Sequence, residues 1–146
     1  MEKHTAEEAE LRRTRRNPFG SSPLDDLTHV IIGSAIRVHS LVGPGLLESS
    51  YEACLFEELR SARLNVLRQV ALPLVYKGVR IDLAYRVDLL VENAVLVELK
   101  AVTKVLPIHE AQVMSYLRLT GLRVGLLINF HVLHLRDGIG RIVNNY

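Results

Sequence analysis

Residues 80–101 read RIDLAYRVDLLVENAVLVELKA, and this stretch decides the fold. Hydrophobic residues alternate along it on both sides of Glu92-Asn93-Ala94, with the period of two that is typical of strands. We therefore predict two antiparallel strands, residues 80–91 and 95–102, joined by a three-residue turn. One face of the first strand would carry Ile81, Leu83, Tyr85, Val87, Leu89 and Val91, and the opposite face Asp82, Ala84, Arg86, Asp88 and Leu90.

The length of the turn sets which charged residues face each other across this strand pair. A three-residue turn places Asp88 opposite Glu98 and Arg86 opposite Lys100. A two-residue turn would set Asp88 against Val97 and send Glu98 to the other face, unless a bulge corrected the register. The three-residue turn predicts two carboxylates whose Cβ atoms lie about 4.5–5.5 Å apart.

Two facing carboxylates repel each other unless a positive charge lies between them. A divalent cation would supply that charge, and Mg²⁺ and Mn²⁺ prefer oxygen ligands of this kind. Lys100 follows on the same face as Glu98, where it could orient water or stabilise charge on a phosphate. Asp88, Glu98 and Lys100 thus fit metal-assisted phosphodiester hydrolysis. The alternative is a solvated strand face on which the same residues form ordinary cross-strand ion pairs.

The rest of the chain predicts two helices before the strand pair and mixed elements after it. Apolar residues recur every three or four positions after Pro23, as on one face of a helix, and Gly43-Pro44-Gly45 breaks that helix. Residues 124–130 suit a strand buried on both faces, and Asp137-Gly138 predicts a terminal hairpin. The order is α-α-β-β-β-α-β plus the C-terminal hairpin, with helices near 23–42, 46–63 and 107–120 and strands near 69–76, 80–91, 95–102, 124–130, 132–136 and 139–143.

Composition limits the classes of protein to which the chain can belong. It has 18 Lys and Arg against 16 Asp and Glu, a formal net charge of +2, which argues against a protein that coats nucleic acid by charge alone. Cys54 is the only cysteine, and no apolar run approaches the roughly 18 residues of a membrane span. We expect a cytoplasmic protein without membrane contact, with a mobile charged tail at residues 1–22 and a single domain at 23–146.

Two motifs give a resemblance to a known family. Asp88 followed by Glu98-Leu99-Lys100 resembles the Asp…Glu-x-Lys signature of the PD-(D/E)XK nuclease superfamily. Residues 45–51, GLLESSY, match the G-x-x-E-x-x-Y motif of a bacterial family within it, the GxxExxY proteins. One departure is that Val87 stands where the superfamily often has a proline before the acid.

Two further motifs follow in the same order along the chain. Gln112 and Tyr116 resemble the Gln-x-x-x-Tyr helix of RecB-like nucleases, and Asn129-Phe130 fits the usual end of the next strand. The similarity spans about residues 24–142, nearly everything but the tail. It implies an α/β fold with a restriction-endonuclease-like core, a mixed central β-sheet flanked by helices, and an active site at one end of the sheet.

The resemblance also assigns roles to residues. Asp88, Glu98 and Glu48 would be metal ligands, and Lys100 would position water or the scissile phosphate. Gln112 would complete the catalytic set by orienting a water or a metal ligand through its amide. From the residues alone, Glu48 could instead be a carboxylate favoured by the helix dipole, and Gln112 an exposed helix residue.

Three auxiliary residues complete the expected site. Tyr116 lies one turn after Gln112 on the same helix face. Tyr51 either bonds an active-site carboxylate or packs in the core. His109 either contacts phosphate or is a first-turn surface residue, and the second interpretation is favoured.

The expected function is that of a metal-dependent nuclease that uses Mg²⁺ or Mn²⁺ to hydrolyse phosphodiester bonds in DNA rather than RNA. The alternative is a catalytically inactive module that keeps the nuclease fold and binds nucleic acid or protein. The terminal hairpin could expose an edge that pairs with a second copy. The expected partners are therefore nucleic acid and, through that edge, a homodimer.

Overall fold

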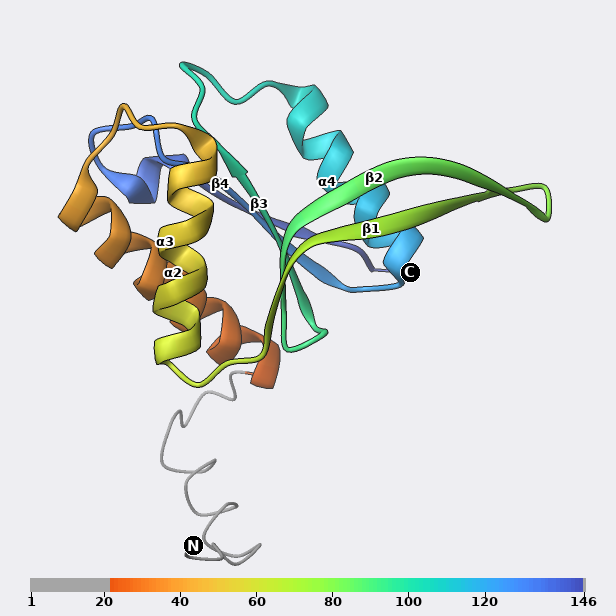
Figure 1. Ribbon diagram of the computed structural model, residues 1–146, viewed down its shortest axis with the longest axis horizontal. Coiled ribbons are helices and arrows are strands. Elements are labelled where there is room, and N and C mark those ends of the chain that lie inside the picture. Colours follow the sequence, from red (N-terminus) through yellow and green to blue (C-terminus); the bar gives the residue numbers. More distant parts are fainter. Residues whose placement is uncertain (1–21, 146) are drawn as a thin grey trace, which may run out of the picture.

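The computed structural model describes residues 22–145, apart from the side chains of residues 83 and 84 (Figure 1). The predicted tail lies outside this range, except for Ser22. The elements are α2 (Pro23–Val42), α3 (Glu48–Ser61), β1 (Val66–Tyr76), β2 (Val79–Val91), β3 (Val95–Lys100), α4 (Pro107–Thr120), β4 (Val124–Asn129), the short 3₁₀ helix η1 (Leu135–Gly138) and β5 (Ile139–Val143).

The strands form one mixed sheet in the order β1-β2-β3-β4-β5. All neighbours are antiparallel except β3 and β4, which run parallel because α4 connects them. Every residue of β4 is buried, as predicted for a strand covered on both faces. The predicted α/β fold with a mixed central sheet flanked by helices is confirmed.

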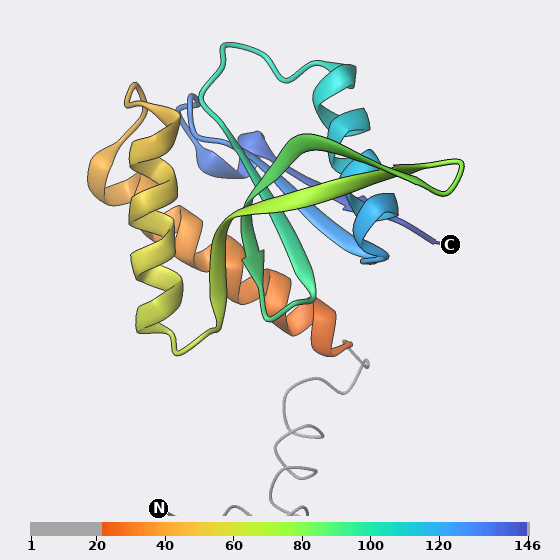
Figure 2. The same cartoon turned by 45° about the vertical axis from the view of Figure 1, so that its right-hand side comes forward.

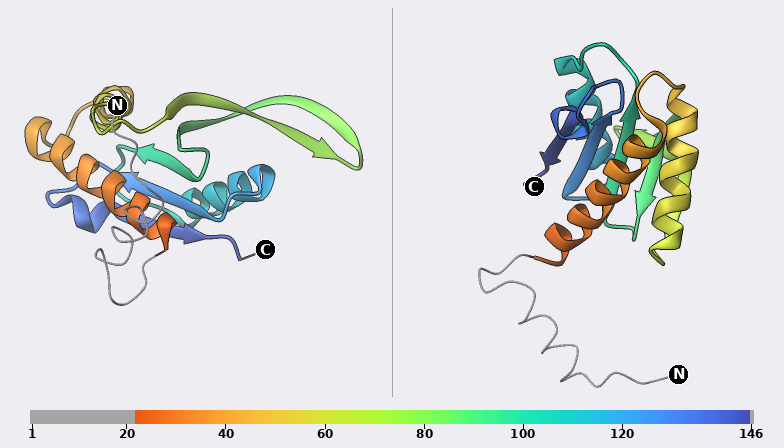
Figure 3. Two further views of the ribbon diagram at one scale, coloured as in Figure 1. Left: turned by 90° about the horizontal axis from the view of Figure 1, so that it is seen from below. Right: turned by 90° about the vertical axis from the view of Figure 1, so that its left-hand side faces the viewer.

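Helices cover the two faces of the sheet separately (Figures 1 and 3). The helices α2 and α3 pack on one face, over the side chains of Leu89, Val97 and Leu99. The helix α4 packs on the other face, over Leu96 and Leu127. Because side chains alternate along β3, Glu98 and Lys100 belong to the face that carries α4.

The first helix begins where its sequence predicts. Ser22 accepts a hydrogen bond from the backbone N–H of Asp25, and the Asp25 carboxylate accepts one from the Ser22 N–H in return, which forms a capping box. Gly43, with a φ of 70°, ends the helix. The chain then turns through residues 43–47 and enters α3 at Glu48, so the loop delivers Glu48 to one end of the sheet.

The β1–β2 hairpin changes face midway along its length. On β2, Leu89 packs beneath α2 and α3, whereas Val87, two residues earlier, packs on the α4 side. On β1 the change falls at Gln69, whose φ of 49° lies in the left-handed region. The ladder pairs on either side set Gln69 opposite Asp88. The prediction that Val87 and Leu89 share a face is therefore wrong, because both strands kink at this pair.

The kink also ends the pairing of β2 with β3. The register Leu89–Val97 and Val91–Val95 confirms the predicted three-residue turn. The part of β2 that precedes Leu89 does not pair with β3. This part of the β1–β2 hairpin extends away from β3 and lies beside α4 (Figures 1 and 2). The predicted pairing of Lys100 with Arg86 is wrong, since β3 continues beside β4 and Lys100 aligns with Asn129.

The predicted terminal hairpin is also wrong. Residues 131–134 form bends, Asp137-Gly138 lies in η1, and β5 pairs with β4 instead of with residues 132–136. Two contacts explain the difference. The His39 ring nitrogen Nε2 lies 2.8 Å from the carbonyl oxygen of Val132. A Cβ atom at Gly138 would lie 2.2 Å from the carbonyl oxygen of Asn129, so this close approach requires glycine.

Candidate active site

Asp88 and Glu98 meet where the β2–β3 ladder opens. The backbone N–H of Asp88 donates to Glu98 Oε1 at 3.1 Å, and the N–H of Leu99 donates to Asp88 Oδ2 at 2.8 Å. Each carboxylate thus binds a backbone donor at the point where cross-strand pairing stops. The predicted juxtaposition of these two acids is confirmed. Hydrogen bonds from backbone N–H groups to the two carboxyl groups replace the regular ladder at this point.

Glu98 is buried, with 4% of its surface exposed. Burial raises the pKa of its carboxyl group to about 8, and the negative charge of Asp88 adds to this effect. The hydrogen bond from Asp88 N–H and the charge of Lys100 act in the opposite direction. Without further positive charge, Glu98 therefore holds its proton at neutral pH.

Asp88 is affected in the same direction. Burial raises the pKa of its carboxyl group, and hydrogen bonds from Leu99 and Gln69 partly offset this. Lys100 lies half-buried at the end of β3, and its charge lowers the pKa of both Asp88 and Glu98. The lysine therefore stands within electrostatic reach of both carboxylates.

Glu48 opens α3 and extends the cluster. Partial burial raises the pKa of its carboxyl group, Lys100 lowers it, and Asp88 raises it. A backbone hydrogen bond from Ala101, the residue after β3, also lowers it. The structure thus brings Glu48 to the same end of the sheet as Asp88 and Lys100. Glu48 is therefore both a helix-terminal carboxylate and a member of the cluster.

Two residues that the sequence analysis missed belong to this cluster. Glu52 is buried, with 8% of its surface exposed, and accepts hydrogen bonds from Arg68 Nη2 at 3.1 Å and from Gln69 Nε2. Gln69 Nε2 also lies 3.2 Å from Asp88 Oδ1. Gln69 therefore links the helix that carries Glu48 to the strand that carries Asp88. The i, i+4 spacing of Glu48 and Glu52 was the available signal, because it places both acids on one helix face.

An open hollow of about 380 Å³ lies between α3 and the kinked hairpin. Its polar lining includes Glu48, Ser49, Glu52, Gln69 and Asp88. Acid and amide side chains from three separate elements thus converge on one depression at the end of the sheet.

A sequence profile described as the PD-(D/E)XK nuclease superfamily matches residues 25–142. The chain belongs to this superfamily. A search of curated proteins finds no match. A solved structure titled "Crystal structure of SSO0001" is 16% identical, with a TM-score of 0.42, over 95% of this chain and 76% of its own.

Within this PD-(D/E)XK nuclease domain, the Gln-x-x-x-Tyr pair lies on α4. Gln112 Nε2 donates to the Tyr116 hydroxyl at 2.9 Å. Burial raises the pKa of the Tyr116 phenol, and the charges of Glu98 and Asp88 raise it further. Tyr116 thus approaches the carboxylates from the α4 side, and Gln112 orients its hydroxyl.

Tyr51 lies apart from the carboxylates. It is fully buried and stacks on Phe130, with ring centroids 4.3 Å apart. Its hydroxyl donates to the carbonyl oxygen of Gly43 at 2.7 Å and accepts from the Leu46 N–H at 3.0 Å. Of the two interpretations, the structure favours the core residue, and Tyr51 fixes the loop that leads to Glu48.

His109 lies in the first turn of α4, where its Nδ1 accepts a hydrogen bond from the backbone N–H of Leu106 at 3.0 Å. This bond caps the helix. The favoured interpretation is a first-turn surface residue; the structure places His109 in the first turn, but half-buried.

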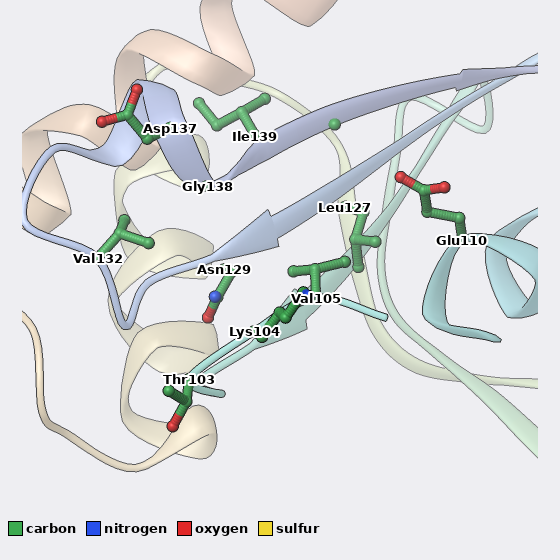
Figure 4. Close-up of a pocket in the computed structure, with 11 residues that line it drawn as sticks. Thr103, Lys104, Val105, Glu110, Leu127, Asn129, Val132, Asp137, Gly138 and Ile139 are labelled. Atoms are coloured by element: carbon green, nitrogen blue, oxygen red, sulfur yellow. The ribbon is translucent and has the colours of Figure 1, made fainter. Parts of the chain in front are cut away.

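A second hollow, of about 350 Å³, lies behind the loop that follows β3 (Figure 4). Asn129 of β4 forms part of its wall and holds the loop by bonds to the N–H and carbonyl of Val102, at 3.1 and 2.8 Å. Glu110 and Asp137 line it from α4 and η1. None of the residues predicted to be catalytic lines this hollow.

PD-(D/E)XK nucleases generally use Mg²⁺ or Mn²⁺. Among residues 22–145, no group of three or more His, Cys, Asp and Glu side chains converges tightly enough to hold a metal ion. Mg²⁺ is often bound by only one or two carboxylates together with water and substrate phosphate. The all-oxygen pair Asp88 and Glu98, held together by backbone hydrogen bonds, fits that requirement.

Within residues 22–145, no helix combines the length and the apolar character that a membrane span requires.

Proposed function

We propose that this protein is a metal-dependent nuclease of the GxxExxY group that hydrolyses phosphodiester bonds in DNA. The observation that carries the proposal is the meeting of Asp88, Glu98 and Lys100 at one end of the sheet. Each of the two carboxyl groups accepts a backbone hydrogen bond from the strand that carries the other, at 2.8 Å for Asp88 and 3.1 Å for Glu98. Lys100, at the end of the strand that carries Glu98, supplies a cation within electrostatic reach of both carboxyl groups.

Each residue of the expected site has a distinct role in this proposal. Asp88 and Glu98 would hold Mg²⁺ or Mn²⁺, with Glu48 as a further acid that acts directly or through water. The ion would supply Lewis-acid stabilisation of charge on the phosphate. Lys100 would position water or the scissile phosphate and stabilise negative charge that develops on it. Gln112 would act through Tyr116, which it already orients.

The net charge of +2 is compatible with this activity. Three of the 16 acids, Asp88, Glu98 and Glu48, belong to the proposed metal site, and a bound ion would offset their repulsion of phosphate.

We propose that the protein acts in the cytoplasm, where its single cysteine, Cys54, would remain reduced.

We retain the homodimer as a proposal, although the predicted terminal hairpin is absent. The strand β5 takes its place as one edge of the sheet that residues 22–145 form, and edge strands can pair with a strand of another chain. Two copies would supply one site for each strand of a duplex. Sedimentation at micromolar protein concentration, with and without a charged substitution at the exposed Val143, tests this arrangement.

The test is cleavage of labelled DNA in Mg²⁺ by the wild type and by Asp88→Ala, Glu98→Ala and Lys100→Ala. Each variant should lose about 100-fold or more in rate with its circular dichroism unchanged. Glu57→Gln is the matched control, because this side chain is 68% exposed on α3 and forms an ion pair with the exposed Arg60. Equal cleavage by all five proteins would refute the proposal.

Calorimetry with Mn²⁺ separates the nuclease from an inactive binding module of the same fold. The nuclease should bind the ion at millimolar concentration, and Asp88→Ala should abolish the heat signal. Absence of binding by the wild type would favour the inactive module.

A further inference from the structure

A third hollow, of about 430 Å³, lies between the β1–β2 hairpin and α4. The hairpin contributes Leu74 and Tyr85, and α4 contributes Ser115 and Leu119 (the elements are seen side by side in Figure 1). It is open on one side, and it exists because the kink at Gln69 and Asp88 carries the hairpin across to the α4 face.

The walls of this hollow combine flat apolar surface with a small number of polar groups. Tyr85 is 39% exposed and Leu119 is 38% exposed, so an aromatic ring and an aliphatic side chain both remain open to solvent. The rings of Tyr85 and Tyr116 lie 6.2 Å apart at an interplanar angle of 55°. Ser115 adds a hydroxyl group, and Arg118 adds a guanidinium group. Pockets for small ring systems have this composition, with apolar and aromatic walls and a few polar groups that fix orientation.

The hollow adjoins the proposed catalytic centre. Gln112 and Tyr116 line it, and Tyr116 packs in one cluster with Val87, the neighbour of Asp88, and with Leu96, two residues before Glu98. A nucleotide bound at the carboxylate cluster would therefore have this hollow as the adjacent space for its base. Arg118, an exposed cation at the same site, is placed to contact a neighbouring phosphate.

We propose that the hollow between the β1–β2 hairpin and α4 binds one unstacked nucleobase of the DNA strand that is cut, next to the scissile phosphate. The base would stack on Tyr85 and be contacted by the polar groups of α4. A base inside a duplex is stacked on both faces and cannot enter such a hollow, whereas single-stranded bases are read on aromatic side chains in this way. The inference rests on the proposed nuclease function and adds to it a substrate that is unpaired at the point of cleavage.

The test is a binding experiment, so that it does not depend on cleavage. Single-stranded DNA oligonucleotides that each carry one abasic position are titrated by fluorescence anisotropy against the full-length Lys100→Ala protein in Mg²⁺. One abasic position should weaken binding by about 5- to 150-fold, the loss expected for one stacked base. The Tyr85→Ala substitution in the same background should remove the effect of that position and leave the other positions unchanged.

Two further variants keep the result interpretable. Tyr76→Ala is the matched control, because Tyr76 is a 59% exposed tyrosine on the same hairpin that does not line the hollow. It should preserve the abasic effect. Ser115→Phe fills the hollow from an exposed helix position and should remove the effect even if Tyr85→Ala disturbs the hairpin.

The inference is overturned if no abasic position matters, or if its penalty is the same in the parent protein and in both hollow variants. Cleavage by the wild-type protein is scored separately. A protein that cuts DNA but shows no coupling between Tyr85 and an abasic position would retain the nuclease proposal and lose the base site. A protein that shows the coupling but never cuts would retain the base site and lose the nuclease proposal.

Discussion

Replacing Glu98 by glutamine in the metal-free protein should change how stability depends on pH. Burial beside Asp88 raises the pKa of Glu98 from 4.5 to about 8. Between these two values the folded protein holds a proton that the unfolded chain has released. The free energy of unfolding therefore falls as pH rises through this window.

The size of the effect follows from the two pKa values. The interval from 4.5 to about 8 corresponds to roughly 5 kcal/mol, at 1.36 kcal/mol per pH unit. This is the largest change in the free energy of unfolding that the titration of Glu98 alone can produce. Glu98→Gln cannot ionise, yet its amide oxygen can still accept the hydrogen bond from the Asp88 N–H. A residual slope of the same sign should remain, because the pKa values of Asp88 and Glu48 are also raised.

The assay is urea denaturation at pH 5 to 9 in EDTA, with Glu57→Gln as the exposed control. The wild type and the control should lose several kcal/mol across this range, and Glu98→Gln should lose markedly less. Added Mg²⁺ should flatten the wild-type curve, because a cation favours the ionised carboxylate. Parallel curves for the wild type and Glu98→Gln would refute the reasoning.

Three further predictions follow from other contacts. Tyr51→Phe removes the hydroxyl that bridges Gly43 and Leu46 and should lower the free energy of unfolding by about 1–3 kcal/mol, so an unchanged urea midpoint would contradict its role in the loop. Gln69→Glu places a third carboxylate beside Glu52 and Asp88 and should destabilise the metal-free protein more at pH 8 than at pH 5; equal losses at both values would count against the bridge. Lys77 and Arg80 are exposed cations at the tip of the β1–β2 hairpin, beside α4 and its hollow. Replacing both by alanine should reduce the dependence of DNA affinity on salt by about one to two ions, and an unchanged slope would exclude the hairpin from the DNA contact.

Much of the fold was predictable because local patterns agreed with it. The alternation on either side of Glu92-Asn93-Ala94 predicts both the strand pair and its register, and the register follows from the length of the turn alone. The apolar run of β4 and the Pro107 start of α4 were equally clear. In each case the residues of the element itself, or of two elements adjacent in sequence, contained the pattern that predicts it.

The parts of the site that the sequence did not predict depend on contacts between distant segments of the chain. Near its tip, the hairpin pairs Tyr76 with Val79, but a register shift between Leu72 and Leu74 changes the partners of every earlier residue. Counting back from the tip would set Gln69 opposite Arg86, whereas the shift sets it opposite Asp88. No local pattern encodes such a bulge, so the bridge from Gln69 to Glu52 could not be derived.

The C-terminal segment failed for a similar reason. Asp137-Gly138 has the composition of a hairpin turn, but tertiary contacts override this local preference. The bond between His39 and Val132 and the close approach of Gly138 to Asn129 bring η1 against the end of the sheet. The edge of β4 is then paired by β5.

The most direct test of the catalytic cluster is a comparison of two lysines that lie four residues apart, Lys100 at the end of β3 and Lys104 in the loop that follows. The rate of DNA cleavage in Mg²⁺ is measured for Lys100→Met and for Lys104→Met, which is exposed on the loop after β3 and lines the hollow of Figure 4. Lys100→Met should cleave about 100-fold more slowly than wild type or worse, whereas Lys104→Met should remain within a few-fold of it. Equal rates for the two variants would contradict the assignment of the active site to Asp88, Glu98 and Lys100.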